Sequence, residues 1–152
     1  MKKTDIAYLA GMFDGEGCIV IHDRKWQTKR GLLRQGFYPE ICLANTNEWI
    51  IHQFRFAFGG NIYLRKKTTT KSQAIWAWQT TSKKATRCLE VLLPYLKLKK
   101  RQAELAIEME KRRRPKGSYR LEPDESIAWQ QAQKILISNI NKNKSQEGEV
   151  AS

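Results

Sequence analysis

The chain has 152 residues, a length that predicts one domain with a substantial hydrophobic core. Its 28 Lys and Arg residues outnumber 15 Asp and Glu residues, and this excess favours a nucleic-acid partner over a membrane surface or plain solubility. No stretch is apolar enough to span a membrane, and the three cysteines lack metal-ligand spacing, which argues against a structural zinc site and is typical of a reduced, intracellular protein.

Hydrophobic periodicity and turn residues divide the chain into nine elements. The first is a helix that begins near Thr4 or Asp5, either of which can cap it, and ends at Gly15 and Gly17. The others, in chain order, are strands at 18–26 and 37–44, a helix at 45–60, strands at 61–67 and 73–80, and helices at 82–94, 96–114 and 120–140. The polar residues 142–152 are expected to form a disordered tail behind a single domain at 1–141.

This order predicts an α+β fold. Two β-hairpins, each with a helix on either side, make an αββαββα core with extra C-terminal helices. We expect the strands to form one curved antiparallel sheet with helices on one face and an open saddle on the other. Pro39 has no N–H group, so its place in the second strand suggests an edge position or a bulge.

Side-chain alternation assigns the two faces of the strands. Ile19 and Ile21 share one face of the first strand. The other face carries Val20, His22, Arg24 and Trp26. Trp76 and Trp78 are expected inside the core, because tryptophan is more often a core residue than a base-stacking platform. The intervening residues of that strand then lie on the open face of the sheet.

Basic residues gather on or between the strands, and we expect them to project from the open sheet face. A curved ribbon of strands fits the major groove, where Arg can bind guanine and Gln can bind adenine, while Lys more often holds phosphate. Arg24 and Arg65 are the candidate guanine contacts. The alternative is a solvated polar sheet face. The predicted DNA-binding residues are His22, Arg24, Trp26, Lys29, Arg30, Arg34, Tyr38, Glu40, Tyr63, Arg65, Lys67, Lys71, Gln73 and Gln79.

The segment YLAGMFDGEGCIVI, at 8–21, places Glu16 at the C-terminal end of the first helix. A carboxylate there opposes the negative end of the helix macrodipole, where stability alone would favour Lys or Arg. Free helix carbonyls beside a carboxylate are hard oxygen ligands of the kind Mg²⁺ uses. From the residues alone two interpretations stay open, a cation site or a solvated turn.

The motif LAGMFDGEG, at 9–17, resembles the signature of the LAGLIDADG homing endonucleases. Leu9, Ala10, Gly11, Asp14 and Gly17 match the name-giving pattern, and the acid at position 16 keeps its final carboxylate. Two later segments also resemble the family, ANTNEWIIHQFRFAFGGNIY at 44–63 and LLPYLKLKKRQAELA at 92–106. The resemblance spans about residues 6–110.

The resemblance implies a site-specific double-strand DNA endonuclease that hydrolyses phosphodiesters with Mg²⁺, with Mn²⁺ or Ca²⁺ able to substitute in binding. Glu16 and the Gly15 carbonyl would hold the metal, while Asp14 supports the turn. Lys99 matches the family's active-site lysine, and Asn45 falls near a polar residue that organises water. These residues favour the cation site over the solvated turn.

Members with a single motif resemble one another in acting as homodimers on pseudo-palindromic DNA. Ala7, Gly11 and Gly15 form a stripe of small residues on the first helix, and together with Ala10 they are the predicted dimer interface. We expect an organelle or a bacterial or phage host cytoplasm as location, and no membrane partner. The alternative functions are an intron maturase, a catalytically silent nucleic-acid-binding protein and an RNA-associated basic domain.

Overall fold

In the computed structural model of the chain, the described residues are 1–65, 73–113 and 124–150, with side chains described up to 143. The predicted α+β fold and element order are confirmed. The elements are α1 (Lys3–Glu16), β1 (Gly17–Gln27), β2 (Leu33–Asn45), α2 (Glu48–Phe58), β3 (Asn61–Arg65), β4 (Ile75–Thr81), α3 (Ser82–Leu92), a 3₁₀ turn η1 (Leu93–Tyr95), α4 (Lys100–Arg112) and α5 (Asp124–Val150).

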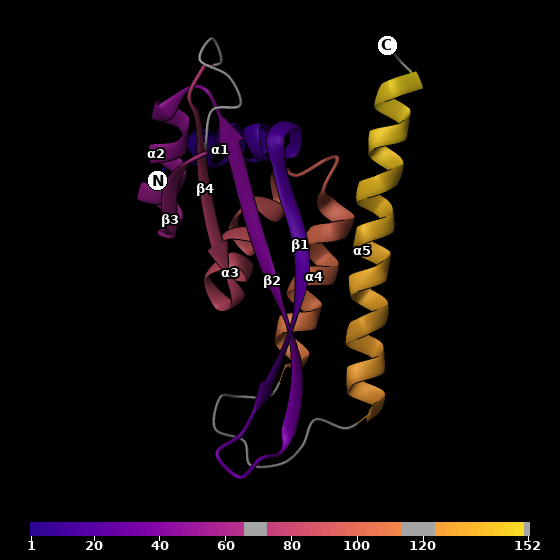
Figure 1. Cartoon of the computed structure of the whole chain (residues 1–152). Helices are drawn as coiled ribbons and strands as arrows, with labels where there is room; N and C mark the ends of the chain where they lie inside the picture. Colours follow the sequence, from indigo (N-terminus) through magenta and orange to yellow (C-terminus); the bar gives the residue numbers. More distant parts are fainter. Residues whose placement is uncertain (66–72, 114–123, 151–152) are drawn as a thin grey trace.

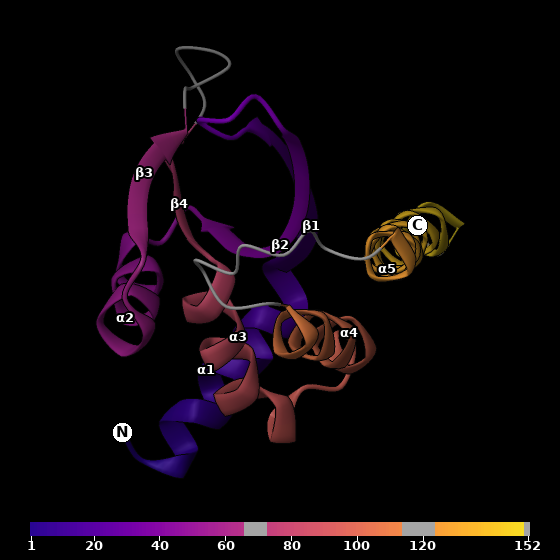
Figure 2. The same cartoon turned by 90° about the horizontal axis from the view of Figure 1, so that it is seen from below.

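The four strands form one antiparallel sheet in the order β1-β2-β4-β3. Figure 2 shows that this sheet is curved, with β1 and β3 as its raised edges. The helices α1, α2, α3 and α4 lie on the convex side, and no described helix covers the concave side (Figure 2). The sheet therefore presents an open, hollowed face along its length.

Polar side chains set the ends of the first two helices. α1 begins at Lys3, before the predicted cap, because the Asp5 carboxylate accepts the Lys2 backbone N–H at 3.0 Å. The Asn47 side chain caps α2 by accepting the Trp49 N–H at 3.0 Å. Gly59 ends that helix at a φ of 71°, a left-handed conformation that suits glycine.

β1 and β2 are longer than predicted and extend as a ribbon beyond the helices (Figure 1). We expected a polar connection at 27–36, but only residues 28–32 connect the strands. The Thr28 hydroxyl and carbonyl oxygens both bind within this turn, accepting the Leu32 and Gly31 N–H groups at 3.1 and 2.9 Å. Gly36 stays in the strand because the Trp26 ring lies over it, where a Cβ atom would meet the ring at 3.2 Å.

Pro39 lies within a central strand rather than an edge strand. It pairs with Ile21 of β1, while the pairing of β2 with β4 covers only Glu40–Asn45. The chain is therefore a local edge at Pro39, on the side away from β1. This explains how a residue without an N–H group fits the sheet.

The C-terminal helices depart from their predicted limits. α4 begins at Lys100 rather than residue 96, and α5 continues to Val150, through the segment 142–150 for which we expected a tail. No proline interrupts the helix there, and the residues are mostly polar helix formers. The ion pair between Lys134 and Asp23 and the hydrogen bond from Asn141 Nδ2 to the Ile19 carbonyl (3.0 Å) join α5 to β1.

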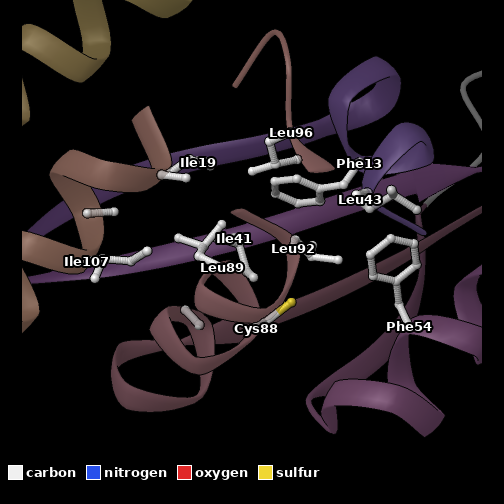
Figure 3. Close-up of a cluster of buried hydrophobic side chains, with 14 of the residues drawn as sticks. Phe13, Ile19, Ile41, Leu43, Phe54, Cys88, Leu89, Leu92, Leu96 and Ile107 are labelled. Atoms are coloured by element: carbon white, nitrogen blue, oxygen red, sulfur yellow. The ribbon is translucent and has the colours of Figure 1, made fainter. Parts of the chain in front are cut away.

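The hydrophobic core lies between the convex sheet face and the helices (Figure 3). Phe13 of α1 and Phe54 of α2 pack within 6.3 Å between ring centroids, and both are fully buried. Trp78 is also fully buried, and its Nε1 donates to the Gly59 carbonyl at 2.6 Å. Trp76 packs against the same cluster, so the inward facing of both tryptophans is confirmed.

Candidate active site

Glu16 and Asn45 meet where α1 ends, β1 begins and β2 ends. Asn45 Nδ2 donates a hydrogen bond to Glu16 Oε2, and Asn45 Oδ1 accepts the Asn47 backbone N–H at 2.7 Å. The second contact fixes which end of the amide points to the carboxylate. Two predicted catalytic residues that are 29 positions apart in the chain are thus in direct contact.

Asp14 ties this end of α1 to the segment that precedes α4. Its buried carboxylate accepts the backbone N–H groups of Lys97 (2.5 Å), Leu98 (3.1 Å) and Lys99 (2.9 Å). If α4 began at residue 96, these N–H groups would lie in its first turn, where no carbonyl of the helix can accept them. The contact explains why residues 97–99 are not helical, and it shows that Asp14 is a structural anchor.

Lys99 lies at the C-terminal end of α1. Its Nζ donates to the backbone carbonyl of Asp14. No basic residue stands in the last turn of α1, so Lys99 supplies from another segment the positive charge that a helix C-terminus favours. Asp14 therefore holds both the backbone of Lys99 and the end of its side chain close to the turn that carries Glu16.

Two cysteines near this cluster were not among the predicted site residues. Cys18 and Cys42 are opposite each other in β1 and β2. The interaction with the Cys42 thiol lowers the pKa of Cys18 to about 6, helped by the positive charge of Lys99, while the pKa of Cys42 is raised. Alternation along each strand could have placed both on the open face, but their pairing needed the register.

The concave sheet face carries most of the predicted DNA-binding residues. His22 and Tyr38 are cross-strand partners with stacked rings, and Glu40 Oε1 lies 3.5 Å from His22 Nε2. Alternation and register bring together on this face His22, Arg24, Trp26, Arg34, Tyr38, Glu40, Tyr63, Arg65 and Gln79. The face is therefore mixed aromatic and basic over β1, β2 and β3.

Three further predicted DNA contacts lie at the ends of the strands. Lys29 and Arg30 are exposed in the turn between β1 and β2, and Gln73 is exposed just before β4. Lys67 and Lys71 lie outside the described residues.

Two of the four residues in the predicted dimer interface on α1, Gly11 and Gly15, are exposed to solvent. A Cβ atom built on Gly11 or Gly15 would meet nothing within 4 Å, so neither glycine packs against the chain's own core. Ala7 is half-buried. Ala10 is fully buried in the core beside Leu9, so it leaves no surface for the predicted interface and its inclusion there was wrong.

The donor atoms at the end of α1 suit a hard cation that takes few protein ligands. Among the described residues, no group of three or more His, Cys, Asp and Glu side chains could hold a metal. Glu16 is exposed, however, and the space beside Gly15 is open. Mg²⁺ commonly uses one or two carboxylates and completes its shell with water and substrate phosphates, so this sparse set fits Mg²⁺. No described helix could cross a membrane.

Neither a family model nor a curated protein sequence matches the chain. Its fold is similar to solved structures of homing endonucleases. I-CvuI in complex with the I-CreI target and 2 mM Mg is 26% identical, with a TM-score of 0.55 over 72% of this chain and 67% of that chain. I-CvuI with its own target and 2 mM Ca is 22% identical, with a TM-score of 0.60 over 91% and 80% of the two chains.

A third similar structure is the archaeal intron-encoded homing endonuclease I-Vdi141I complexed with DNA. It is 12% identical and has a TM-score of 0.52 over 89% of this chain and 99% of that chain. The chain therefore has the homing endonuclease fold, and the shared features lie in the backbone far more than in the sequence.

Proposed function

We propose that the chain is a divalent-metal-dependent, site-specific DNA endonuclease of the LAGLIDADG type. The observation that carries this proposal is the cluster at the end of α1, where Asp14 anchors Lys99 and Asn45 holds Glu16. A turn that served only to join a helix to a strand would not need a lysine, a carboxylate and an amide drawn from three separate segments. The likeness of the fold to homing endonucleases solved with DNA supports the same function.

DNA would bind the concave sheet face. That face is open, strongly curved and lined by Arg24, Arg34 and Arg65, while the core occupies the other face. Arg side chains reach base edges in the major groove, and Lys29 and Arg30 at the ribbon tip would contact phosphates. The net charge of +13 would supply most of the affinity, with the salt dependence expected of phosphate contacts.

Glu16 and the carbonyl of Gly15 would hold the divalent cation. Such a cation stabilises charge on the phosphate oxygens and lowers the pKa of a bound water. Asn45 orients the Glu16 carboxylate, and its own orientation is set by the Asn47 N–H. Lys99, held at Asp14, supplies positive charge for the scissile phosphate. The described groups that meet at the end of α1 are a carboxylate, an amide and an ammonium, so we expect water to be the nucleophile.

Cleavage of both strands requires two such clusters, and we propose that two copies pair through α1. Gly11 and Gly15 face open space, which lets two helix backbones approach closely. Tyr8 and Trp49 flank this surface with side chains that are 53% and 57% exposed, and their rings lie 6.5 Å apart. Pairing would bury these aromatic rings and bring the two Glu16 residues together.

Gly11→Leu tests the pairing. The added side chain projects into open space, so the isolated chain should fold normally while the two helices are held apart. Sedimentation should show a dimer for the wild type at micromolar concentration and a monomer for the variant. A monomeric wild type, both free and on DNA, would contradict the dimer.

Glu16→Gln tests the chemistry. Glutamine keeps the size of the side chain and an oxygen that can accept the Asn45 bond, but it removes the negative charge. Cleavage should fall by orders of magnitude, because loss of metal-based charge stabilisation costs several kcal/mol. Binding should survive, since affinity comes from the basic sheet face. The substrate is a plasmid library with randomised target sites, cut in Mg²⁺ and bound in Ca²⁺.

Glu108→Gln is the matched control, because Glu108 forms an ion pair with Arg112 on the surface of α4, outside the cluster at the end of α1. It should cut and bind like the wild type. Undiminished cutting by Glu16→Gln would place the metal site elsewhere. Binding without cutting in the wild type, across the divalent metals, would instead identify a silent binding protein or a maturase.

A further inference from the structure

Cys18 and Cys42 form a pair of thiols that the proposed nuclease chemistry does not use. They are direct partners in the β1–β2 register and share the concave face of the sheet. Both are half-buried, and alternation along the two strands puts both side chains on that face. Cys88, the third cysteine, is buried in the core, with 1% of its surface exposed. Only the cross-strand pair is therefore both accessible and preassembled.

The Cα spacing expected at this pair falls within the range that a disulfide can span. The Ile19 carbonyl points away from β2, since Asn141 of α5 donates to it. Pro39, two register positions further along, has no N–H to donate. Antiparallel pairs alternate, so Cys18 and Cys42 form a hydrogen-bonded pair, where Cα atoms are about 5.5 Å apart and side chains stand farther apart than in the other kind of pair. Closing the bond would therefore draw the two strands together locally and leave the disulfide strained, which makes it easier to reduce. A disulfide spans Cα separations of about 4.4–6.8 Å.

We propose that Cys18 and Cys42 are a redox modification site that hydroperoxides convert to an intramolecular disulfide and that dithiol reductants reopen. One thiol attacks the peroxide, loses its proton and becomes a sulfenic acid as the O–O bond breaks and water leaves. The second thiol attacks that sulfur, forming the S–S bond and releasing a second water. Two thiols thus lose two electrons and two protons to one hydrogen peroxide molecule.

The bond would cross-link the strands close to the proposed active site. Cys18 lies two residues after Glu16, and Cys42 lies three residues before Asn45. The disulfide would join the start of β1 to the end of β2, just beyond the contact between Glu16 and Asn45. Formation of this bond does not depend on nuclease activity, so the proposal can be tested whether or not the chain cleaves DNA.

The experiment exposes the reduced full-length chain to hydrogen peroxide, unfolds it, alkylates it with N-ethylmaleimide and measures its intact mass. The reduced chain should carry three adducts, and the oxidised chain one adduct and two fewer hydrogens. Trypsin should yield peptide 4–24 cross-linked to peptide 35–55. Dithiothreitol should restore all three adducts.

Cysteine variants and oxidation in urea test whether the folded pairing of Cys18 with Cys42 produces the cross-link. Cys88→Ser should form the cross-link at the wild-type rate, whereas Cys18→Ser and Cys42→Ser should form none. Oxidation in urea should lose the selectivity, since the fold holds the thiols together. The proposal would be overturned by three adducts after treatment that fully oxidises glutathione. Disulfides to Cys88 or between chains, or cysteines that gain oxygen without forming a disulfide, would also overturn it. The same preference for the Cys18–Cys42 link in urea would show that the fold is not responsible.

Discussion

The two halves of the β1–β2 ribbon differ in what lies behind them. In the backed half, residues 17–22 pair with 38–43, and every second side chain is buried against the helices. In the free half, residues 24–27 pair with 33–36, and no β1 side chain there is buried. The two halves belong to the same strands, yet one is built into the core and the other extends into solvent (Figure 1).

The backed half can hold side chains in fixed positions, whereas the free half can accept substitutions. Catalytic groups must be held to within a fraction of an ångström, and the backed half leads directly into Glu16 and Asn45. The free half carries Arg24 and Trp26, whose replacement leaves no core cavity. Residues that contact DNA there can change with little loss of stability.

The largest expected contrast between the halves is in stability. Ile21→Ala should lower the free energy of unfolding by about 2–5 kcal/mol, because it opens a cavity in the core. Lys25→Ala is the matched control, since Lys25 points to the same side of β1 in the free half, and its effect should stay within about 0.5 kcal/mol. Urea unfolding measures both, and equal effects would remove the distinction.

Replacing Asp14 tests the contact that joins the end of α1, where the backed half begins, to the segment before α4. Asp14→Ala should cost about 2–3 kcal/mol of unfolding free energy, because three backbone N–H groups lose a charged acceptor. Asp5→Ala, at the exposed start of α1, should cost no more than about 1 kcal/mol. Urea unfolding again measures both variants. A smaller loss for Asp14 than for Asp5 would show that the anchor is dispensable.

The smallest effects should come from the free half and the tip, and they should appear in DNA binding. Arg24→Ala should relax preference at one base pair in each half-site, at a cost of about 1–3 kcal/mol. Lys29→Ala should weaken all sequences alike and lower the salt slope by about one. Site-preference profiling and binding isotherms at several salt concentrations distinguish the two. An unchanged profile for Arg24→Ala would show that its side chain does not reach the bases.

Local patterns predicted much of this molecule because they act over short distances. Glycines and capping residues mark the ends of α1 and α2, and alternation places Ile19 and Ile21 inward. The same kind of pattern failed at Ala10, where a motif of small residues did not reveal which small residue faces the core. It also failed at Lys97–Lys99, where a helical pattern was overridden by the Asp14 carboxylate from a distant segment.

The sequence by itself determined the element order, the inward and outward faces of the strands, and the identity of the carboxylate at the end of α1. Only the tertiary structure decided which groups meet there. Asn45 reaches Glu16, Lys99 reaches the last turn of α1, and Cys18 faces Cys42. Periodicity reports the direction of a side chain from its own backbone. Contacts between segments depend instead on register and packing, which arise only when the strands pair and the core closes.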